Sequence, residues 1–389
     1  MLKHTLIASI GSLLFVLPVT SFAQEPPTIT VKKSDTLSVS ISGVTGPDSG
    51  SVAPILGNDL NLAGGLSISP EASAAYVVKG TANSGSLSGS VTDRSGKVLF
   101  QKNYSGSSRA NAHAFADDVV FAILGQKGLA GSKLAFVSAR TGRKEIYISD
   151  YDGTNIQQLT KENNISVGPC ISPDGRKMVY TGYQSGYADV YLVDFATGNR
   201  TRIIKYPGTN TGAVFSPDGS RLAVSLSKDG NPELYVTGAN GSGARRLTRT
   251  KGVESSPTWS PDGNELIYVS DDGGSPQLYR ISANGGTPSK ISTGYGYCTE
   301  PSWSPDGKKL AFNVRTGGGL QIAVLDFATG AVRLMTTGSN AEDPAFGPNS
   351  RSILFVQGGK LYMIDSVTGR KTQIAGEVSR ISEPSWSRN

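Results

Sequence analysis

The chain has 389 residues, including 48 glycines and 20 prolines, and 17% of its residues are charged. The formal net charge of +6 is small for this length and comes without a run of Lys or Arg, so nucleic acid is not expected to be a partner. The charged fraction is also too low for a disordered chain. The abundance of turn-forming residues favours a folded, mainly β protein that is long enough for two domains.

The first residues have the features of an export signal. Lys3 and His4 precede an apolar run from Leu6 to Leu17, which is too short to span a bilayer. The sequence Ser21-Phe22-Ala23 then offers the small residues of a cleavage site. We therefore expect residues 1–23 to be a signal peptide, and the mature chain to be soluble, outside the cytoplasm and without direct membrane insertion.

Residues 24–35 are polar and contain Pro26 and Pro27, and we expect them to form a flexible N-terminal arm. Residues 36–130 are predicted to form a small α/β domain. The second of its two helices has the clearer pattern, because apolar side chains recur at helical spacing and Gly125 follows the last of them. The predicted strands are Leu37–Ser42, Tyr76–Lys79, Ser86–Thr92 and Val98–Tyr104, and the predicted helices are Val52–Ala63 and Arg109–Leu124.

Residues 131–389 contain a repeat that includes every tryptophan of the chain. Trp259, Trp303 and Trp386 all follow a Pro-Thr or Pro-Ser pair and precede a serine. That serine, or the residue in its place, recurs with a period of 44 residues and then slightly less, at Ser172, Ser216, Ser260, Ser304, Gly347 and Ser387. A period in the low forties that combines turns with alternating strands is typical of one four-stranded propeller blade per repeat.

One repeat shows the predicted blade. Pro301–Ser304 is the first strand, and the Pro-Asp-Gly that follows it forms a turn. Three further strands are predicted at Lys309–Asn313, Leu320–Asp326 and Val332–Met335, since apolar and polar residues alternate there and Gly-containing turns separate them.

The repeats predict a closed ring of six blades. The sixth blade is split, because residues 133–160 supply three strands and Glu383–Ser387 supplies the missing first strand. This closure would remove the open edges of the sheet stack. The predicted fold is thus mainly β, a six-bladed β-propeller preceded by a small α/β domain. The five complete blades begin near Pro169, Ala213, Pro257, Pro301 and Pro344.

The composition argues against catalysis. His113 is the single histidine beyond residue 23, so a Ser-His-Asp triad would have to use it. It lies in a predicted helix, however, and the chain contains no G-x-S-x-G motif. We therefore expect no enzyme activity, no metal site built on clustered histidines and no cofactor. We predict that His113 is a partly exposed helix residue.

Two other residue pairs are predicted to be structural. Asp150 and Asp152 resemble half of a calcium loop, but the glutamate that would complete the loop is missing. Turn formation is therefore the favoured role, with a metal as the alternative. Cys170 and Cys298 lie about three blades apart, on opposite sides of the expected tunnel, and should not form a disulfide.

The segments before each first strand are predicted to be loops around one mouth of the central tunnel. They vary from blade to blade within a regular repeat, as a specific binding surface would, although plain solvated loops are the alternative. For Glu300, Asp343 and Glu383, which precede the blade proline, the alternative is a hydrogen bond to the neighbouring blade. The candidate partner-binding residues are Thr209, Asn210, Glu254, Tyr297, Thr299, Glu300, Asn340 and Glu342.

The whole arrangement resembles the TolB family, the periplasmic component of the Tol-Pal system. The resemblance rests on the export signal, the small α/β domain, the P-x-W-S-P-D-G repeats, and segments such as ISDYDGTNIQQLT and AHAFADDVVFAILGQKGLAGSKLAFV. One departure is a shorter stretch between the first helix and Tyr76 than the family usually has.

This resemblance implies a non-catalytic, monomeric adaptor in the periplasm. Its propeller mouth would bind Pal, the peptidoglycan-associated outer-membrane lipoprotein, and its N-terminal arm would bind the inner-membrane protein TolA. Such an adaptor would support outer-membrane integrity, protein transport and cell division. An envelope propeller that binds peptide or glycan, related to the propellers of peptidases, is the alternative.

Overall fold

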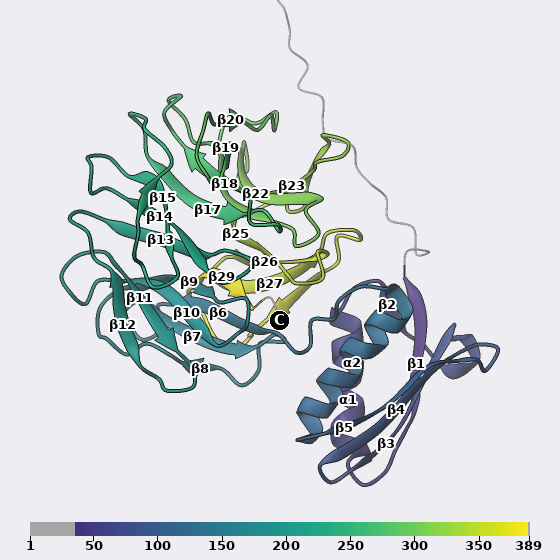
Figure 1. Ribbon diagram of the computed structural model, residues 1–389. Coiled ribbons are helices and arrows are strands. Elements are labelled where there is room, and N and C mark those ends of the chain that lie inside the picture. Colours follow the sequence, from purple (N-terminus) through teal and green to yellow (C-terminus); the bar gives the residue numbers. More distant parts are fainter. Residues whose placement is uncertain (1–35, 388–389) are drawn as a thin grey trace, which may run out of the picture.

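The computed structural model describes residues 36–387 and contains two parts, a small α/β domain and a propeller (Figure 1). The predicted signal peptide and arm lie outside these residues. The small domain has one sheet of strand order β2-β1-β3-β4-β5. Its elements are β1 (Leu37–Thr45), α1 (Ser49–Leu62), β2 (Leu66–Ile68), a 3-10 turn η2 (Glu71–Ser73), β3 (Tyr76–Asn83), β4 (Ser86–Asp93), β5 (Val98–Ser105) and α2 (Ser108–Leu124).

Both predicted helices and the predicted strands are present, whereas the three-residue β2 was not predicted. The longer helix, α2, begins where the Ser107 side chain accepts a hydrogen bond from Ala110 N (3.2 Å), and it ends at Gly125, whose φ is 64°. Phe115 points from α2 onto β4. It packs so closely that a Cβ at Gly89 would lie 2.5 Å from its ring, so the sequence needs glycine at that position.

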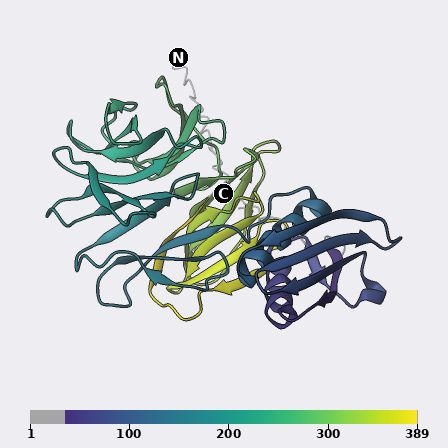
Figure 2. The same cartoon turned by 60° about the horizontal axis from the view of Figure 1, so that its bottom comes forward.

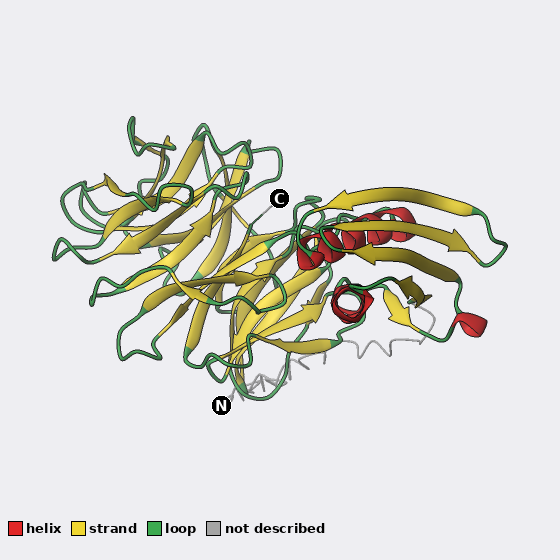
Figure 3. Ribbon diagram, turned by 90° about the horizontal axis from the view of Figure 1, so that it is seen from below, coloured by secondary structure: helices red, strands yellow, loops and turns green. Residues whose placement is uncertain are grey.

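The propeller consists of six four-stranded sheets, which we number as blades 1 to 6. Figure 3 shows that helices are confined to the small domain. Blades 1 to 3 are β9 (Ser166–Ile171), β10 (Lys177–Gly182), β11 (Asp189–Asp194) and β12 (Arg200–Ile204); β13 (Asn210–Phe215), β14 (Arg221–Leu226), β15 (Glu233–Gly238) and β16 (Arg245–Arg246); and β17 (Glu254–Trp259), β18 (Glu265–Ser270), β19 (Gln277–Ser282) and β20 (Ser289–Lys290).

The remaining blades follow the same order, except that blade 6 takes its first strand from the end of the chain. Blades 4 and 5 are β21 (Cys298–Trp303), β22 (Lys309–Thr316), β23 (Gly319–Asp326) and β24 (Val332–Leu334); and β25 (Ala341–Phe346), β26 (Ser352–Gln357), β27 (Lys360–Asp365) and β28 (Lys371–Ile374). Blade 6 is β29 (Ile381–Trp386), β6 (Lys133–Ser138), β7 (Glu145–Asp150) and β8 (Gln157–Gln158).

The predicted ring closure is confirmed. Strand β29 pairs with β6 in an antiparallel register that places Trp386 opposite Leu134. Two hydrogen bonds between Lys133 and Ser387 extend this pairing, one of them from Lys133 N to the Ser387 hydroxyl (2.8 Å). The innermost strands of successive blades contact one another all round the ring, with β29 against β9. The first and last segments of the propeller are therefore held together within one sheet.

The repeated Ser-Pro-Asp-Gly motif forms the turn between the first and second strand of a blade. In blade 4, the Ser304 hydroxyl donates to Asp306 Oδ1 (2.6 Å) and accepts a hydrogen bond from Lys309 N (2.9 Å). Gly307 takes a φ of 76°, as the turn requires. The predicted turn role of these aspartates is confirmed.

Two of the three tryptophans of the motif join neighbouring blades through their indoles, whereas the Trp303 indole N–H donates to Gly307 O (3.3 Å) in its own blade. The Trp259 indole N–H donates to Val214 O (3.1 Å) on the adjacent innermost strand, and the Trp386 indole N–H donates to Ala345 O (3.0 Å). Both rings are buried. Each of these residues thus fills the joint between two blades and satisfies a buried carbonyl there.

The innermost strands begin two or three residues earlier than predicted. The segments predicted to be loops are largely the first residues of these strands, so part of each segment is buried between blades. A β-bulge interrupts each strand at the same place, for example between Thr299 and Ser302 in blade 4.

Cys298 is buried, Cys170 is half-buried, and no disulfide joins them, as predicted.

The two ends of the ring differ in what they contact. The starts of the innermost strands, with the turns between second and third strands, form one end, which we call the open rim. The opposite end, which we call the junction end, carries the other turns and contacts the small domain. In Figure 1, α1 and α2 lie on the side of the small sheet that faces the propeller, and Figure 2 shows this domain beside the last blades.

Candidate functional site

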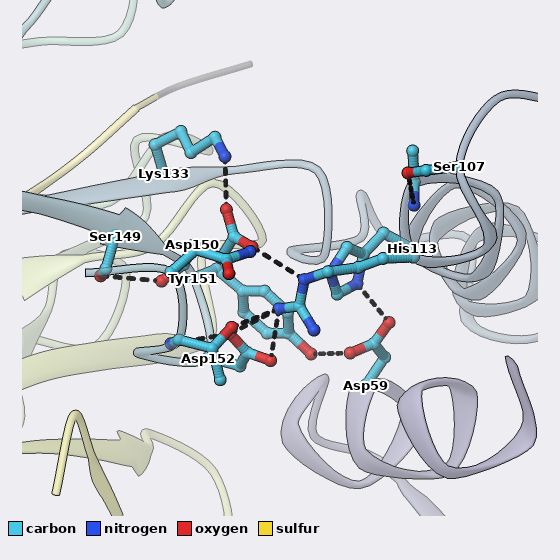
Figure 4. A network of polar contacts seen from close by, with 12 residues as sticks. Asp59, Ser107, His113, Lys133, Ser149, Asp150, Tyr151 and Asp152 are labelled. Carbon is cyan, nitrogen blue, oxygen red and sulfur yellow. Dashed lines mark hydrogen bonds and ion pairs between the residues drawn. The ribbon is translucent and has the colours of Figure 1, made fainter. Parts of the chain in front are cut away.

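The junction end is held by a charged clamp between α2 and blade 6 (Figure 4). Arg109 Nε donates to Asp150 (2.8 Å), and its Nη2 donates to Asp152 (2.8 Å). Lys133 also binds Asp150. Burial works to raise the pKa of Asp150, but the hydrogen bonds from Lys133 and Arg109 outweigh it and hold this pKa below its usual value.

A buried hydrogen-bonded chain lies beside this clamp. The two Asp59 carboxylate oxygens contact His113 Nδ1 (2.6 Å) and accept a hydrogen bond from the Tyr151 hydroxyl (2.7 Å). Burial raises the pKa of Asp59. The prediction that His113 is partly exposed was wrong, because α1 and the β7–β8 turn enclose it and leave only 7% of the residue exposed. A helical pattern in one segment could not reveal that cover.

These contacts assign the aspartates at the junction end to structure. Asp150 and Asp152 both bind Arg109, and each also accepts a hydrogen bond within its own turn, in agreement with a turn role. Between residues 36 and 387, no group of three His, Cys, Asp or Glu side chains is arranged to hold a metal ion. A second clamp, between Arg351 and Asp365 (2.9 Å), packs against Gly64 and Gly65 after α1.

The open rim carries a row of carboxylates with a different arrangement. Glu300 accepts a hydrogen bond from Asp343 N (3.1 Å), Asp343 accepts one from Glu383 N (2.7 Å), and Glu383 accepts one from Gly168 N (2.6 Å). The row therefore spans the innermost strands of blades 4, 5, 6 and 1. The alternative role considered for these three acids, bonding to the neighbouring blade, is confirmed.

The row brings carboxyl groups close together at the mouth of the tunnel, which favours their protonated forms. Burial, followed by the neighbouring Asp343, raises the pKa of Glu300 to about 9. Burial and the Asp343 charge also raise the pKa of Glu383 and of Glu342. The nearest cation is Lys144, whose Nζ lies 3.7 Å from a Glu383 oxygen and is half exposed.

The eight candidate partner-binding residues fall into two groups. Thr209 and Asn340 are exposed, and Tyr297, Thr299, Glu300 and Glu342 are half-buried at the rim. The Tyr297 ring stacks under the Arg315 guanidinium, 4.0 Å from its centre. Asn210 and Glu254, in contrast, are fully buried at the joints between blades, because the innermost strands begin at these residues. They are not part of the rim surface, which corrects the expectation from the sequence.

Asp343 and Glu383 complete the carboxylate row; the sequence singled them out as residues before the blade proline, but they were not among the eight candidates. Three exposed apolar residues of the rim were not predicted. Ile165, Tyr187 and Val253 expose 39%, 72% and 41% of their surface at this end. They lie in short connections, where the sequence has no periodic pattern that would tell an exposed apolar residue from a buried one.

The closed ring of six four-stranded sheets and the clamped small domain define a six-bladed β-propeller with an N-terminal α/β domain. A family model described as the TolB beta propeller domain matches residues 121–389. The chain belongs to the TolB family. No helix described between residues 36 and 387 is long and apolar enough to cross a membrane.

Individual relatives agree with this membership. The chain is 44% identical over 109 residues to the Protein TolB homolog of Chlorobium chlorochromatii, which is 26% of this chain and 25% of that protein. It is 45% identical over 84 residues to the Tol-Pal system protein TolB of Geobacter metallireducens, 21% of this chain and 20% of that protein. The chain thus aligns with no more than a quarter of the length of these curated relatives.

A solved structure matches over a longer range. The crystal structure of TolB from Acinetobacter baumannii superposes with a TM-score of 0.80 and 25% sequence identity, covering 90% of this chain and 96% of that one. The similarity therefore includes the small domain as well as the propeller. It agrees with membership of the TolB family over both parts of the chain.

Proposed function

We propose that this protein is a non-catalytic periplasmic adaptor of the Tol-Pal system, which binds the peptidoglycan-associated outer-membrane lipoprotein through the open rim. Its N-terminal arm, residues 24–35, would bind the inner-membrane Tol partner, and the complex would support outer-membrane integrity, protein transport and cell division. Membership of the TolB family supports the system. The observation that carries the rim is that its apolar side chains stay exposed, whereas at the junction end the small domain covers the turns of blades 5 and 6.

The chemistry of the rim suits a protein partner. A ring held by six sheets presents its side chains in fixed positions, which lowers the ordering cost of binding. Tyr297 offers an aromatic surface that Arg315 already orients, and Tyr187 and Ile165 add apolar area on another blade. Aromatic side chains contribute a large share of the binding energy at protein interfaces.

Binding of the purified lipoprotein, measured by titration calorimetry, tests this proposal. Tyr297→Ala should weaken binding by about 1–3 kcal/mol, a typical loss for an aromatic contact residue. Phe121→Ala is the matched control, because Phe121 exposes 64% of its surface on the small domain. An equal loss in both variants, or no binding by the unaltered protein, would contradict the proposal.

The arm can be separated from the rim by deletion. Removing residues 24–35 should leave lipoprotein binding intact and abolish binding to the inner-membrane partner. Loss of both activities would show that the arm and the rim do not act independently.

The absence of catalysis rests on the environment of His113. Its Nδ1 contacts Asp59, and its ring is enclosed at the domain junction, away from any serine in a nucleophile motif. A peptide- or glycan-binding propeller is the second candidate. It would be favoured if the rim bound peptidoglycan fragments or short peptides and the purified lipoprotein did not compete.

A further inference from the structure

Each joint between blades brings two strand starts together. Glu254 N, at the start of the innermost strand of blade 3, donates to Pro232 O (3.0 Å), just before the third strand of blade 2. Asn210 N donates to Ala188 O (3.0 Å) in the same way one joint earlier. These backbone bonds set Glu254 beside Glu233, and Asn210 beside Asp189.

The joint between blades 2 and 3 therefore pairs two acids, and both are fully buried. The Glu254 oxygens accept hydrogen bonds from the Ser270 and Thr250 hydroxyls, each at 2.7 Å. Glu233 Oε1 accepts from Arg246 Nη2 and from Thr250 N, also at 2.7 Å. Glu233 Oε2 is buried and has no hydrogen-bond partner among the described residues.

The preceding joint shows one way in which such an acid is satisfied. There, Asn210 Nδ2 donates to Asp189 Oδ1 (3.2 Å), so the amide supplies the donor that the carboxylate needs. Glu254 occupies the position of Asn210, but a carboxylate has no hydrogen to donate. Asn210 donates a hydrogen bond to Asp189, and Glu254 could donate one to Glu233 only in its protonated form.

We propose that Glu254 holds the proton that satisfies Glu233 Oε2, and that the joint between blades 2 and 3 is a pH-sensitive seam of the ring. The seam is closed while the two glutamates share this proton. Above neutral pH the proton leaves, two negative charges face each other in a buried site, and the seam loosens. This inference concerns the ring itself and does not depend on the partner that the rim binds.

The surrounding charges support this assignment. Burial, with the Glu233 charge as a further cause, raises the pKa of Glu254 to about 7. Burial also acts to raise the pKa of Glu233, but hydrogen bonds such as those from Thr250 N and Arg246 outweigh it and hold that pKa below its usual value. Arg246 contacts two carboxyl groups, those of Glu233 and Asp229 (3.8 Å), and Lys228 also binds Asp229. Tyr268 faces Glu254, and no ion pair among the described residues reaches the Glu254 carboxyl group.

The sign of the effect follows from proton linkage. The pKa of Glu254 is higher in the folded protein than in the unfolded chain, so the folded state binds more protons between its ordinary value and about 7. Stability from this group is fully present in acid and is lost as the pH rises through about 7. Glu254 starts the tunnel-lining segment that continues into Ser255 and Ser256, so the loosening acts on the open rim.

Melting temperatures of the full mature protein at several pH values test the seam. In Glu254→Gln the amide supplies a permanent donor, as Asn210 does one joint earlier. Between pH 6 and 8 the unaltered protein should lose about 3 °C or more relative to this variant. Infrared difference spectra should show a protonated carboxyl group that disappears over the same range in the unaltered protein and is missing from Glu254→Gln.

A matched variant should introduce the same pH dependence of the melting temperature at the preceding joint. Asn210→Asp places two acids at the joint between blades 1 and 2, and it should steepen the loss of melting temperature with pH. If Glu254→Gln does not fold, Glu233→Gln replaces it and should flatten the pH dependence for the same reason. The same pH dependence in the unaltered protein and in the folded glutamine variant would overturn the proposal, and so would an unchanged infrared spectrum between pH 6 and 8.

Discussion

At the junction end of the propeller, acidic side chains lie against arginine, whereas at the open rim they lie against one another. Asp150 and Asp152 share Arg109, and Asp365 binds Arg351. In the rim row, Glu300, Asp343 and Glu383 are linked through backbone N–H groups, and the one ion pair that the described residues supply to the row joins Glu383 to the half-exposed Lys144. The two ends are built from the same repeats, so the difference comes from the residues that vary within them.

This difference shows which charges stabilise the fold. Removing one partner of a buried charge pair lowers the free energy of unfolding, because an uncompensated charge remains. A row of carboxylates does not stabilise a fold at neutral or alkaline pH, and burial makes it costlier. We infer that the junction end keeps the two domains in one arrangement, while the rim holds charge that a partner or a proton can meet.

The largest expected loss of stability comes from opening the ring, which carries both the rim and the junction end. Deletion of Glu383–Asn389 takes away most of β29, including Trp386 and its bond to Ala345 O. Blade 6 would lose its innermost strand, and the ring would gain open edges. We expect a loss of several kcal/mol, out of the about 5–15 kcal/mol that a folded domain has in total, or aggregation. An unchanged melting temperature would contradict the closed ring.

A smaller but still large effect is expected at the junction end. Asp59→Ala leaves the Tyr151 hydroxyl and His113 Nδ1 buried without their acceptor, so we expect the free energy of unfolding to fall by about 2–4 kcal/mol. Denaturant unfolding measures it. Glu71→Ala is the control, since Glu71 is exposed and accepts an exposed hydrogen bond from the Ser42 hydroxyl, and it should lose less than half as much. Equal losses would mean that the buried chain does not hold the domains together.

Arg109→Ala should have a more modest effect on the same junction. The guanidinium is partly exposed, and Lys133 remains bound to Asp150 in its absence. We expect a loss of about 1 kcal/mol that decreases as salt is added. A loss as large as that of Asp59→Ala would show that the clamp, rather than the buried chain, dominates the junction.

The rim should respond to pH in the opposite sense to a charge-matched site. Since burial raises the pKa of Glu300 to about 9, its contribution to stability is present in acid and is lost as the pH rises through about 9. Glu300→Gln keeps an acceptor for Asp343 N and removes the charge, so its melting temperature should fall less between pH 7 and 10. The curves of the two proteins should converge below pH 5, and parallel curves would show that Glu300 is not protonated at neutral pH.

The sequence predicted the architecture well because the same blade pattern occurs several times along the chain. The 44-residue period, the Pro-Asp-Gly turns and the split sixth blade all follow from local chemistry that recurs, and a single exception does not hide it. Contacts that cross between repeats or domains carry no such signal. The burial of His113 depends on Asp59 and Tyr151, which are distant in the chain, and the burial of Glu254 depends on where a strand starts. Tyr297 and Glu300 could be placed at the rim, but their neighbours could not.

The most direct test of the account is hydrogen exchange of the protein with and without the purified peptidoglycan-associated lipoprotein. If the lipoprotein binds the open rim, exchange should slow in the segments around Thr209 and Tyr297, on blades 2 and 4. Exchange around Thr154, in the turn that binds Arg109, should stay unchanged. Slower exchange confined to the junction end, or none at any segment, would contradict the assignment of the rim as the binding surface.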